Sequence, residues 1–378
     1  MNSAEPTASP AELTQSIHAE QQAFLQGLEA ELATFFDQQE ETLLSVSEEA
    51  LPLLEAIRDL SSGGKRLRAL LCYWGWRGAG GAADSELIFK AAAALELFQS
   101  AALIHDDIID RSQTRRGAPA VHKQFEIMHR KAQWRSASSL YGSSSAIIAG
   151  DLCLSWSEML LASIGQLASS AYQVRSIFDL MRTEVMAGQY LDILGEVIAT
   201  EEYGSALGRA HHVIRYKSAK YSCEHPLVLG GALALETPRG VCESLLEAYR
   251  AFALPLGEGY QLRDDVLGVF GQPAKTGKPA GDDLKEGKRT VLIALTQKNA
   301  NPKQWQRLDG ALGNKDLSEG EIAELCQIII DSGALADVEA VIAETGNIVS
   351  SALLELKVAP LVKEALAKIA AAALHRSA

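Results

Sequence analysis

Three carboxylates stand close together near the end of the stretch Leu97–Pro119, and two arginines follow them almost at once. Each residue of a helix advances by about 100° around the axis. Asp106 and Asp110 therefore share a helix face, and Asp107 is rotated from Asp106 by about 100°. Like charges at this spacing repel each other, so the cluster favours a bound cation. Carboxylate oxygens suit Mg²⁺, a hard ion that commonly bridges protein carboxylates to substrate phosphates. The stretch therefore predicts a magnesium and phosphate site.

A second acidic pair, Asp264 and Asp265, lies far downstream and must belong to another helix. Lys278 and Lys288 follow it, in or next to a Gly- and Pro-rich loop over residues 271–287. Such a loop suits closure over a bound polyphosphate, with its lysines arriving as water leaves. One acidic pair alone would more often be a solvated turn. Two pairs on separate apolar helices, each followed by basic residues, indicate a diphosphate site facing a metal cluster.

A basic element precedes the first acidic helix. Gly63 and Gly64 lead into Lys65 and Arg68, which are three residues apart and are predicted to share a helix face. The first turn of a helix presents free N–H groups and a positive dipole end, so it attracts anions. Basic side chains oppose that dipole, and a bound diphosphate would remove the conflict. A solvated basic turn is the alternative.

Single polar residues elsewhere are weaker candidates. Gln99 stands two helical turns before Asp106 and can donate to a phosphate oxygen, although a packed polar residue fits equally well. Lys217 and Ser218 lie within a helical pattern, and a lone lysine is usually exposed. Gln189 and Asp192 share a predicted face, where a helix-packing hydrogen bond is as reasonable as an indirect metal contact.

From about Gly63 to Thr290 the chain resembles the trans-type (head-to-tail) polyprenyl diphosphate synthases, with five motifs in the family order. It is most similar to bacterial geranylgeranyl diphosphate synthases. The resemblance implies condensation of isopentenyl diphosphate with dimethylallyl, geranyl or farnesyl diphosphate. It also implies three Mg²⁺ ions per site, with Mn²⁺ as an alternative ion, and a homodimer.

The resemblance also implies roles for individual residues. The metal ligands are Asp106, Asp107, Asp110, Asp264 and Asp265, and of the second pair Asp264 is the better candidate for direct contact. The catalytic residues are Asp106, Asp107, Asp110, Lys217 and Asp264. Isopentenyl diphosphate is bound by Lys65, Arg68, Gln99 and Arg116. The allylic and departing diphosphate is bound by Arg115, Lys217, Ser218, Gln261, Lys278 and Lys288. Gly268 departs from the pattern, because the family often has a third aspartate there.

Product length is expected to depend on the helix that carries Asp106. Ala101 and Ala102 are small and leave room for a growing chain. Phe98 lies eight residues before Asp106, roughly 12 Å along the helix axis, and is the predicted floor of the cavity. These residues favour a C20 product, with C15 or C25–C30 as alternatives.

The hydrophobic periodicity is helical throughout, without strand-like alternation of any length. Periodicity predicts the helices and the resemblance their arrangement: an all-α, single-domain bundle of ten or more helices around a central cavity, with the two acidic helices facing each other. We expect a disordered tail at residues 1–10 and one domain over 11–378. Two helices are predicted to join near residues 37–41, and residues 123–146 are predicted to form a loop or short helix of unknown role.

Composition excludes some functions. A net charge of −13 argues against a nucleic-acid surface, whose affinity depends on Lys and Arg. Five cysteines without CxxC spacing indicate reduced thiols. No signal-peptide pattern and no uncharged run of 18 strongly apolar residues is present, so a cytoplasmic protein that does not span a membrane is expected.

Three other classes of protein deserve comparison. A class I terpene cyclase also uses an acidic motif and Mg²⁺ but does not need the Gly-Gly-Lys-Arg element. A di-iron bundle needs paired Glu-x-x-His motifs, and only Glu126 and His129 have that spacing. A non-catalytic subunit would have lost acidic or basic site residues, whereas this chain has both.

Overall fold

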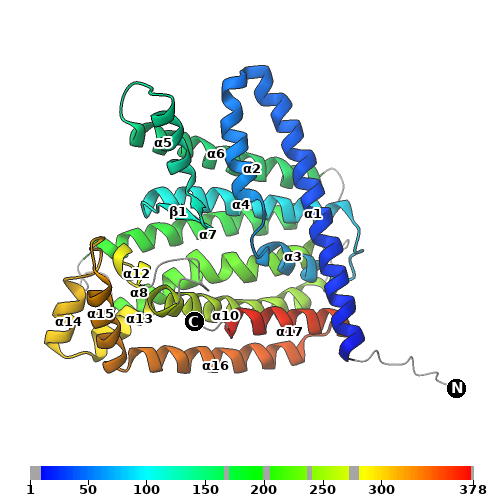
Figure 1. Ribbon diagram of the computed structural model, residues 1–378. Helices are drawn as coiled ribbons and strands as arrows, with labels where there is room; N and C mark the ends of the chain where they lie inside the picture. Colours follow the sequence, from blue (N-terminus) through cyan, green and yellow to red (C-terminus); the bar gives the residue numbers. More distant parts are fainter. Residues whose placement is uncertain (1–9, 166–169, 199–204, 236–240, 272–280, 376–378) are drawn as a thin grey trace. The chain divides into compact units, whose positions relative to one another are not determined.

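The computed structural model describes residues 10–165, 170–198, 205–235, 241–271 and 281–375. Figure 1 shows that these residues are almost entirely helical. The sheet found in these ranges is a single two-stranded hairpin. The predicted all-α class with ten or more helices is therefore confirmed. The predicted disordered tail lies outside the described residues, apart from Pro10.

The chain divides into two compact units, which are described separately. The first contains Met1–Arg175, Leu229–Cys242 and Val358–Ala365, and the second contains Ser176–Val228, Glu243–Lys357 and Leu366–Ala378. The prediction of one domain over residues 11–378 stays a prediction.

The first unit begins with a series of helices interrupted by the hairpin. In chain order the elements are α1 (Pro10–Val46), the 3₁₀ turn η1 (Glu48–Ala50), α2 (Leu51–Ser61), α3 (Leu67–Gly78), α4 (Glu86–Ile109), β1 (Thr114–Arg115), β2 (Ala118–Pro119), α5 (Val121–Lys131) and α6 (Ser138–Ile164).

The later helices lie in the second unit or have residues in both. They are α7 (Ala171–Val197), α8 (Ala206–Val213), the π-helix η2 (Ile214–Glu224), α9 (His225–Ala234), α10 (Val241–Phe270), α12 (Asp282–Glu286), α13 (Val291–Asn299), α14 (Pro302–Asp309), α15 (Glu319–Asp331), α16 (Ala334–Glu355) and α17 (Pro360–Leu374).

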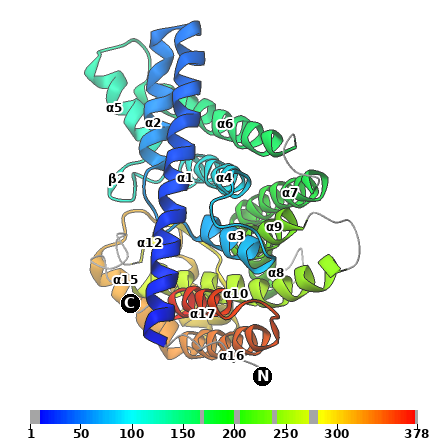
Figure 2. The same ribbon diagram turned by 90° about the vertical axis from the view of Figure 1, so that its right-hand side faces the viewer.

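One sequence prediction about helix boundaries was wrong, and another was right only in part. α1 continues through residues 37–41, because Arg58 of α2 pairs with Asp37 and Glu40 at 2.7 Å each and holds this acidic turn helical. Figure 2 shows α1 and α2 side by side. Residues 123–146 are also mostly helical, since α5 extends to Lys131 and α6 already begins at Ser138.

α4 is the central helix of the first unit and carries the first acidic cluster. The Ser85 side chain accepts from the N–H of Leu87 at its start, and Asp110 caps its end. α4 and α6 are both long and apolar enough to span a membrane by length and composition alone. In α4, 67% of the apolar window is buried among other parts of the protein, which is typical of a core helix.

A buried ion pair ties the loop before α3 to α4. Arg66 donates to Glu96 at 2.8 Å, and each side chain is only 7% exposed. Arg66 also donates to the carbonyl of Ser61 at 2.6 Å, and the hydroxyls of Ser61 and Ser100 are 2.9 Å apart. The conformation of this loop is therefore set by α4.

Removing one member of this pair should destabilise the protein strongly. We expect Glu96→Ala to lower the free energy of unfolding by about 3 kcal/mol, because Arg66 would remain buried without its counter-charge. The double variant Arg66→Met/Glu96→Leu should recover most of that loss, since neither charge remains. Urea unfolding monitored by circular dichroism measures both. A loss below about 1 kcal/mol in the single variant would show that water reaches Arg66.

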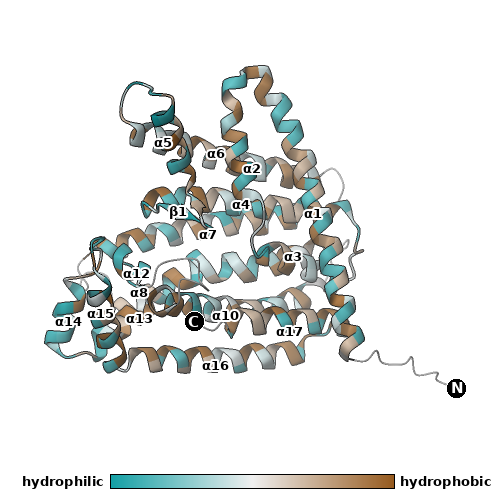
Figure 3. Ribbon diagram, in the orientation of Figure 1, coloured by the Kyte–Doolittle hydropathy of each residue, from teal (hydrophilic) through white to brown (hydrophobic). Residues whose placement is uncertain are grey.

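The second unit has its own hydrophobic core on one face of α10. Leu262, Val266 and Val269 belong to a buried apolar cluster that also contains Leu284 and Leu325. In Figure 3 α13 is largely hydrophobic and α14 largely hydrophilic, which matches the burial of α13. This core holds the C-terminal half of α10, where the second acidic pair lies.

Candidate active site

A tight hairpin directly after α4 places the two arginines. Arg116 and Gly117 form its two-residue loop with φ of 53° and 79°, and Arg115 pairs with Ala118. Positive φ at both loop positions is typical of a type I′ turn, which suits the twist of a hairpin. Arg115 is the last residue of β1, whereas Arg116 is the first residue of the loop. Arg115 and Arg116 accordingly contact different partners.

Arg115 binds Asp107. Its Nε donates to both carboxylate oxygens at 3.0 and 3.2 Å, and its Nη2 also contacts Oδ1 of Asp107. The Asp107 side chain is 1% exposed, and Asp106 lies 3.7 Å from Arg115. Burial alone lowers the pKa of Arg115, but the hydrogen bonds and charge of Asp107 outweigh burial and the net pKa is raised. Asp107 therefore anchors Arg115.

Arg116 lies against the glycine loop of the basic element. Its Nη1 donates to the carbonyl of Leu60 at 2.8 Å and of Ser62 at 3.3 Å. Gly64 has φ of 94°, which favours glycine, and a Cβ there would lie 2.7 Å from Arg116 Nη2. Burial and the charge of Arg66 lower the pKa of Arg116. The hairpin thus brings Arg116 to the loop that carries Lys65.

The predicted shared face of Lys65 and Arg68 was wrong. Helix α3 begins only at Leu67, because Gly63, Gly64 and Arg66 all have positive φ. Lys65 is an exposed loop residue, whereas Arg68 is half-buried in the first turn of the helix. The left-handed conformation of Arg66 accompanies its burial against Glu96. Binding of one diphosphate by Lys65 and Arg68 stays a prediction.

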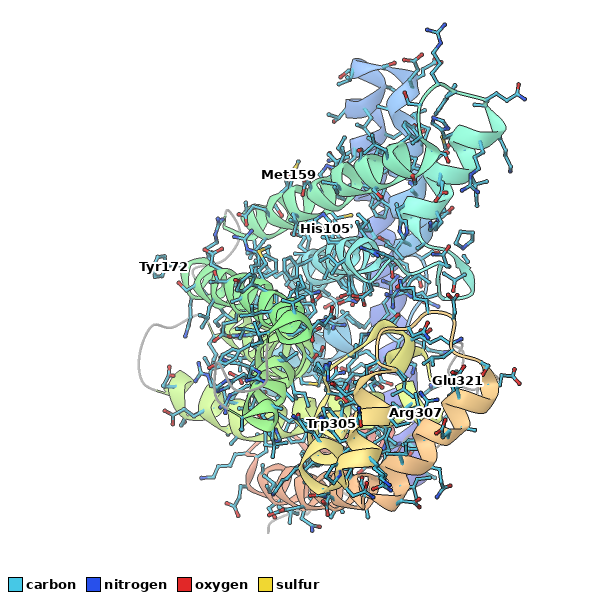
Figure 4. All side chains as sticks on the ribbon, turned by 90° about the vertical axis from the view of Figure 1, so that its left-hand side faces the viewer. His105, Met159, Tyr172, Trp305, Arg307 and Glu321 are labelled. Atoms are coloured by element: carbon cyan, nitrogen blue, oxygen red, sulfur yellow. The ribbon has the colours of Figure 1, made fainter. Side chains whose placement is uncertain are left out.

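The residues proposed for product length all lie in α4. Phe98 and Ala101 are fully buried, with 1% and 0% exposure. Ala102 and Gln99 are partly exposed and lie near the face of Asp106. His105 contacts α6 instead, with Nε2 3.4 Å from the carbonyl of Ile147, and Figure 4 labels it. Asp106, Ala102 and Gln99 therefore form one partly accessible stripe.

In the second unit, Lys217 lies in the π-helix η2. Its Nζ donates to Asp192 of α7 at 2.5 Å. A Cβ at Gly188 would lie 2.4 Å from the backbone N of Lys217, so this glycine lets the two helices approach. π-Helical segments are rare and are frequent at functional sites. Ser218 is half-buried in the same turn.

A second contact fixes η2 on α7. Glu184 accepts from Lys220 at 2.5 Å and from His225 at 2.7 Å. Burial raises the pKa of Glu196, as does the charge of Asp192, whereas the charges of Lys217 and Lys288 oppose the shift. Glu196 therefore lies within electrostatic range of both lysines.

Asp264 and Asp265 have different environments on α10. Asp265 is buried and accepts from Gln261 Nε2 at 2.8 Å, whereas Asp264 is half-buried. Burial raises the pKa of Asp265 well above its ordinary value; the hydrogen bond from Gln261 opposes this, and the charges of Asp283 and Asp264 add to it. Asp264 is therefore the better metal ligand of the pair, in line with the sequence argument.

Of the two remaining predicted lysines, only Lys288 lies within the described residues. Lys288 contacts Glu286 at 2.7 Å and Asp283 at 3.6 Å, and Lys278 lies outside the described residues. Among the described residues no three His, Cys, Asp or Glu side chains form a ready-made metal cage. Mg²⁺ commonly takes one or two carboxylates together with substrate phosphates. Asp106 and Asp110 in the first unit, and Asp264 in the second, each have the oxygen ligands that suit such an ion.

Sequence reasoning missed the pair Arg66 and Glu96 and the contacts of Glu184. Glu96 did carry a signal, because a charged residue within an apolar helical run is rarely buried without a partner. The partner itself lies 30 residues earlier and was not predictable.

A family model and two related sequences match most of this chain. The family model described as polyprenyl synthetase matches residues 52–329. A short chain isoprenyl diphosphate synthase of Methanocaldococcus jannaschii is 30% identical over 81% of this chain and 81% of its own length. A geranylgeranyl diphosphate synthase of Saccharolobus solfataricus is 31% identical over 71% of this chain and 73% of its own length.

One solved structure is similar to this chain over most of its length. It is a geranylgeranyl pyrophosphate synthase from Corynebacterium glutamicum, complexed with isoprenyl diphosphate and magnesium. It is 36% identical, with a TM-score of 0.86, covering 94% of this chain and 99% of that one.

Proposed function

This chain belongs to the polyprenyl synthetase family and is a prenyltransferase, and from that premise we propose that it makes mainly geranylgeranyl diphosphate, the C20 product. Its substrates are isopentenyl diphosphate and the allylic diphosphates dimethylallyl, geranyl and farnesyl diphosphate. The observation that carries the product length is the similarity to geranylgeranyl diphosphate synthases over nearly the whole chain. The small residues Ala101 and Ala102 before the first acidic cluster support it.

The reaction begins with cleavage of the allylic C–O bond. Asp106, Asp110 and Asp264 would hold Mg²⁺, which as a Lewis acid stabilises charge on the leaving diphosphate. Lys217 and Lys288 supply fixed positive charge to the same group. We propose that three ions bind per site and that Mn²⁺ can replace Mg²⁺.

The second substrate then attacks the allylic cation. Lys65, Arg68, Gln99 and Arg116 hold isopentenyl diphosphate so that its double bond faces the cation. The adduct loses a proton to the released diphosphate. Water must be excluded from the site during this step, because it would otherwise quench the cation. Asp107 positions Arg115 for the allylic diphosphate.

Incubation of the protein with isopentenyl diphosphate, Mg²⁺ and each allylic primer in turn tests this function. We expect a C20 alcohol as the main product after dephosphorylation and chromatography. A C15 or C25–C30 main product would contradict the proposed length. A cyclic hydrocarbon from one allylic substrate would instead favour a class I terpene cyclase.

Phe98 should limit product length. We expect Phe98→Ala to shift the product distribution beyond C20, because it removes a fully buried ring from the helix that carries Asp106. Ala101→Phe should shift it towards C15 by adding a ring. Chromatography of the prenyl alcohols measures both. An unchanged distribution in both variants would show that another element forms the floor.

We also propose that the protein is a cytoplasmic homodimer that does not span a membrane. The similarity to other members of the family supports this proposal. Light scattering should give about twice the chain mass of 40.6 kDa, and a mass near that of one chain would contradict the dimer.

A further inference from the structure

The segment that carries Lys217 is a π-helix of unusual length. η2 spans the eleven residues Ile214–Glu224, whereas π-helices are rare and mostly form single turns inside α-helices. The α-helix is the usual alternative for such a segment, so contacts from outside η2 must favour the wider turn. These contacts come from α7, which lies in the same compact unit from Ser176 onward.

Three residues of α7 contact η2 from one face. Glu184, Gly188 and Asp192 are each four residues apart, so they follow one another along the same side of the helix. Gly188 lets the two backbones approach, since a Cβ there would lie 2.4 Å from the backbone N of Lys217. Asp192 accepts from Lys217 Nζ at 2.5 Å. Glu184 is two turns away from Asp192 and binds a different part of the segment.

Glu184 bridges two residues at the end of η2. It accepts from Lys220 Nζ at 2.5 Å and from His225 Nε2 at 2.7 Å. None of the three side chains is more than 17% exposed. Burial raises the pKa of Glu184, but the hydrogen bonds from Lys220 and His225 outweigh burial and the net pKa is lowered. Glu184 is therefore a carboxylate enclosed by two donors.

This bridge suits a π-helix and does not suit an α-helix. The backbone N–H of His225 donates to the carbonyl of Lys220, which is the five-residue bond of a π-turn. Residues joined in this way are about one turn apart, so their side chains can reach the same acceptor. In an α-helix, residues five apart are rotated from each other by about 140°. A single carboxylate would then lose one of its two donors.

We propose that Glu184 is a positioning residue for Lys217, because its bridge holds η2 in the π-helical register. This inference rests on the proposed prenyl transfer and on the role given there to Lys217. Lys217 lies three residues before Lys220, so a change from π to α geometry would rotate it away from Asp192. Glu184 thus acts on the reaction through Lys217 and not by contact with a substrate.

A double-mutant cycle tests whether Glu184 acts through Lys217. Glu184→Leu removes both acceptor oxygens, and we expect it to lower kcat about tenfold by displacing Lys217. KM for isopentenyl diphosphate should stay within about twofold, because that substrate is bound by other residues. In a Lys217→Met background the same change should lower kcat less than about twofold, since no lysine remains to be positioned. An equal loss in both backgrounds would indicate a general structural role and overturn the proposal.

Two further variants separate the bridge from the charge of Glu184. Burial lowers the pKa of His225, so its neutral ring can accept as well as donate a hydrogen bond. The amide of Glu184→Gln can therefore accept from Lys220 and donate to His225, and kcat should stay within about threefold of the wild type. Asp179→Leu removes an acid of α7 that pairs with Arg182 of the same helix, and kcat should not change measurably. A Glu184→Gln variant as slow as Glu184→Leu would overturn the bridge.

The stability of the variants is measured by urea unfolding, and kcat is compared under conditions where each variant is fully folded. If Glu184→Leu does not fold, Lys220→Met takes its place in the cycle, because it removes one arm of the same bridge. Equal losses of kcat with and without Lys217 would again overturn the proposal.

Failure of this inference differs from failure of the proposed function. The function fails if the wild-type protein elongates no allylic diphosphate. The inference fails if the wild-type protein is active and the effect of Glu184→Leu does not depend on Lys217.

Discussion

Asp106→Asn should lower kcat about 10³-fold, which corresponds to roughly 4 kcal/mol of lost transition-state stabilisation. Asp106 lies in the last turn of α4, and its side chain is 23% exposed. The neighbouring Asp107 is enclosed by Arg115 and is only 1% exposed. Asp106 is therefore the carboxylate at this position that can reach an ion on a bound diphosphate. Steady-state kinetics at saturating Mg²⁺ and both substrates measures the loss.

A matched control separates this effect from a general loss of charge. Glu86→Gln removes one acid from the first turn of the same helix, where Glu86 pairs with Lys90 at 3.0 Å and its side chain is 64% exposed. We expect its kcat to stay within twofold of the wild type. The assignment of Asp106 is wrong if Asp106→Asn keeps more than a tenth of wild-type kcat.

Lys217→Met should lower kcat about 10²-fold while KM for the allylic diphosphate rises much less. Negative charge on the departing diphosphate grows in the transition state, so a cation beside it contributes more there than in the ground state. In the structure Lys217 is held by Asp192 at 2.5 Å, which keeps its side chain in one orientation. Separate determination of kcat and KM measures the difference.

Two further variants test whether the loss of kcat is specific to the position of Lys217. Lys298→Gln removes an exposed lysine from the end of α13 and should leave kcat within twofold. Gly188→Ala should lower kcat without removing any charge, because the added Cβ displaces the backbone of Lys217. A Lys217→Met variant that raises KM without lowering kcat would show that Lys217 binds the substrate and the transition state equally.

Much of the local structure was predictable, because it depends on neighbours in the chain. The helix from Ser85 to Asp110 follows from its cap and its run of good helix formers. The continuous helix through residues 37–41 was not, since its acidic turn is stabilised by Arg58 from the next helix. The delayed start of α3 also depends on a distant residue, Glu96.

The sequence by itself determined the chemistry of this protein: carboxylates for magnesium, basic side chains for diphosphates, and apolar periodicity for an all-α fold. These properties belong to residue types and short spacings, so they can be read along the chain. Only the tertiary structure decided which of these carboxylates is accessible to a metal ion. It encloses Asp107 with Arg115, buries Asp265 under Gln261, and places Asp283 beside Gly268. Those outcomes depend on contacts between segments distant in the chain, and no local pattern encodes such contacts.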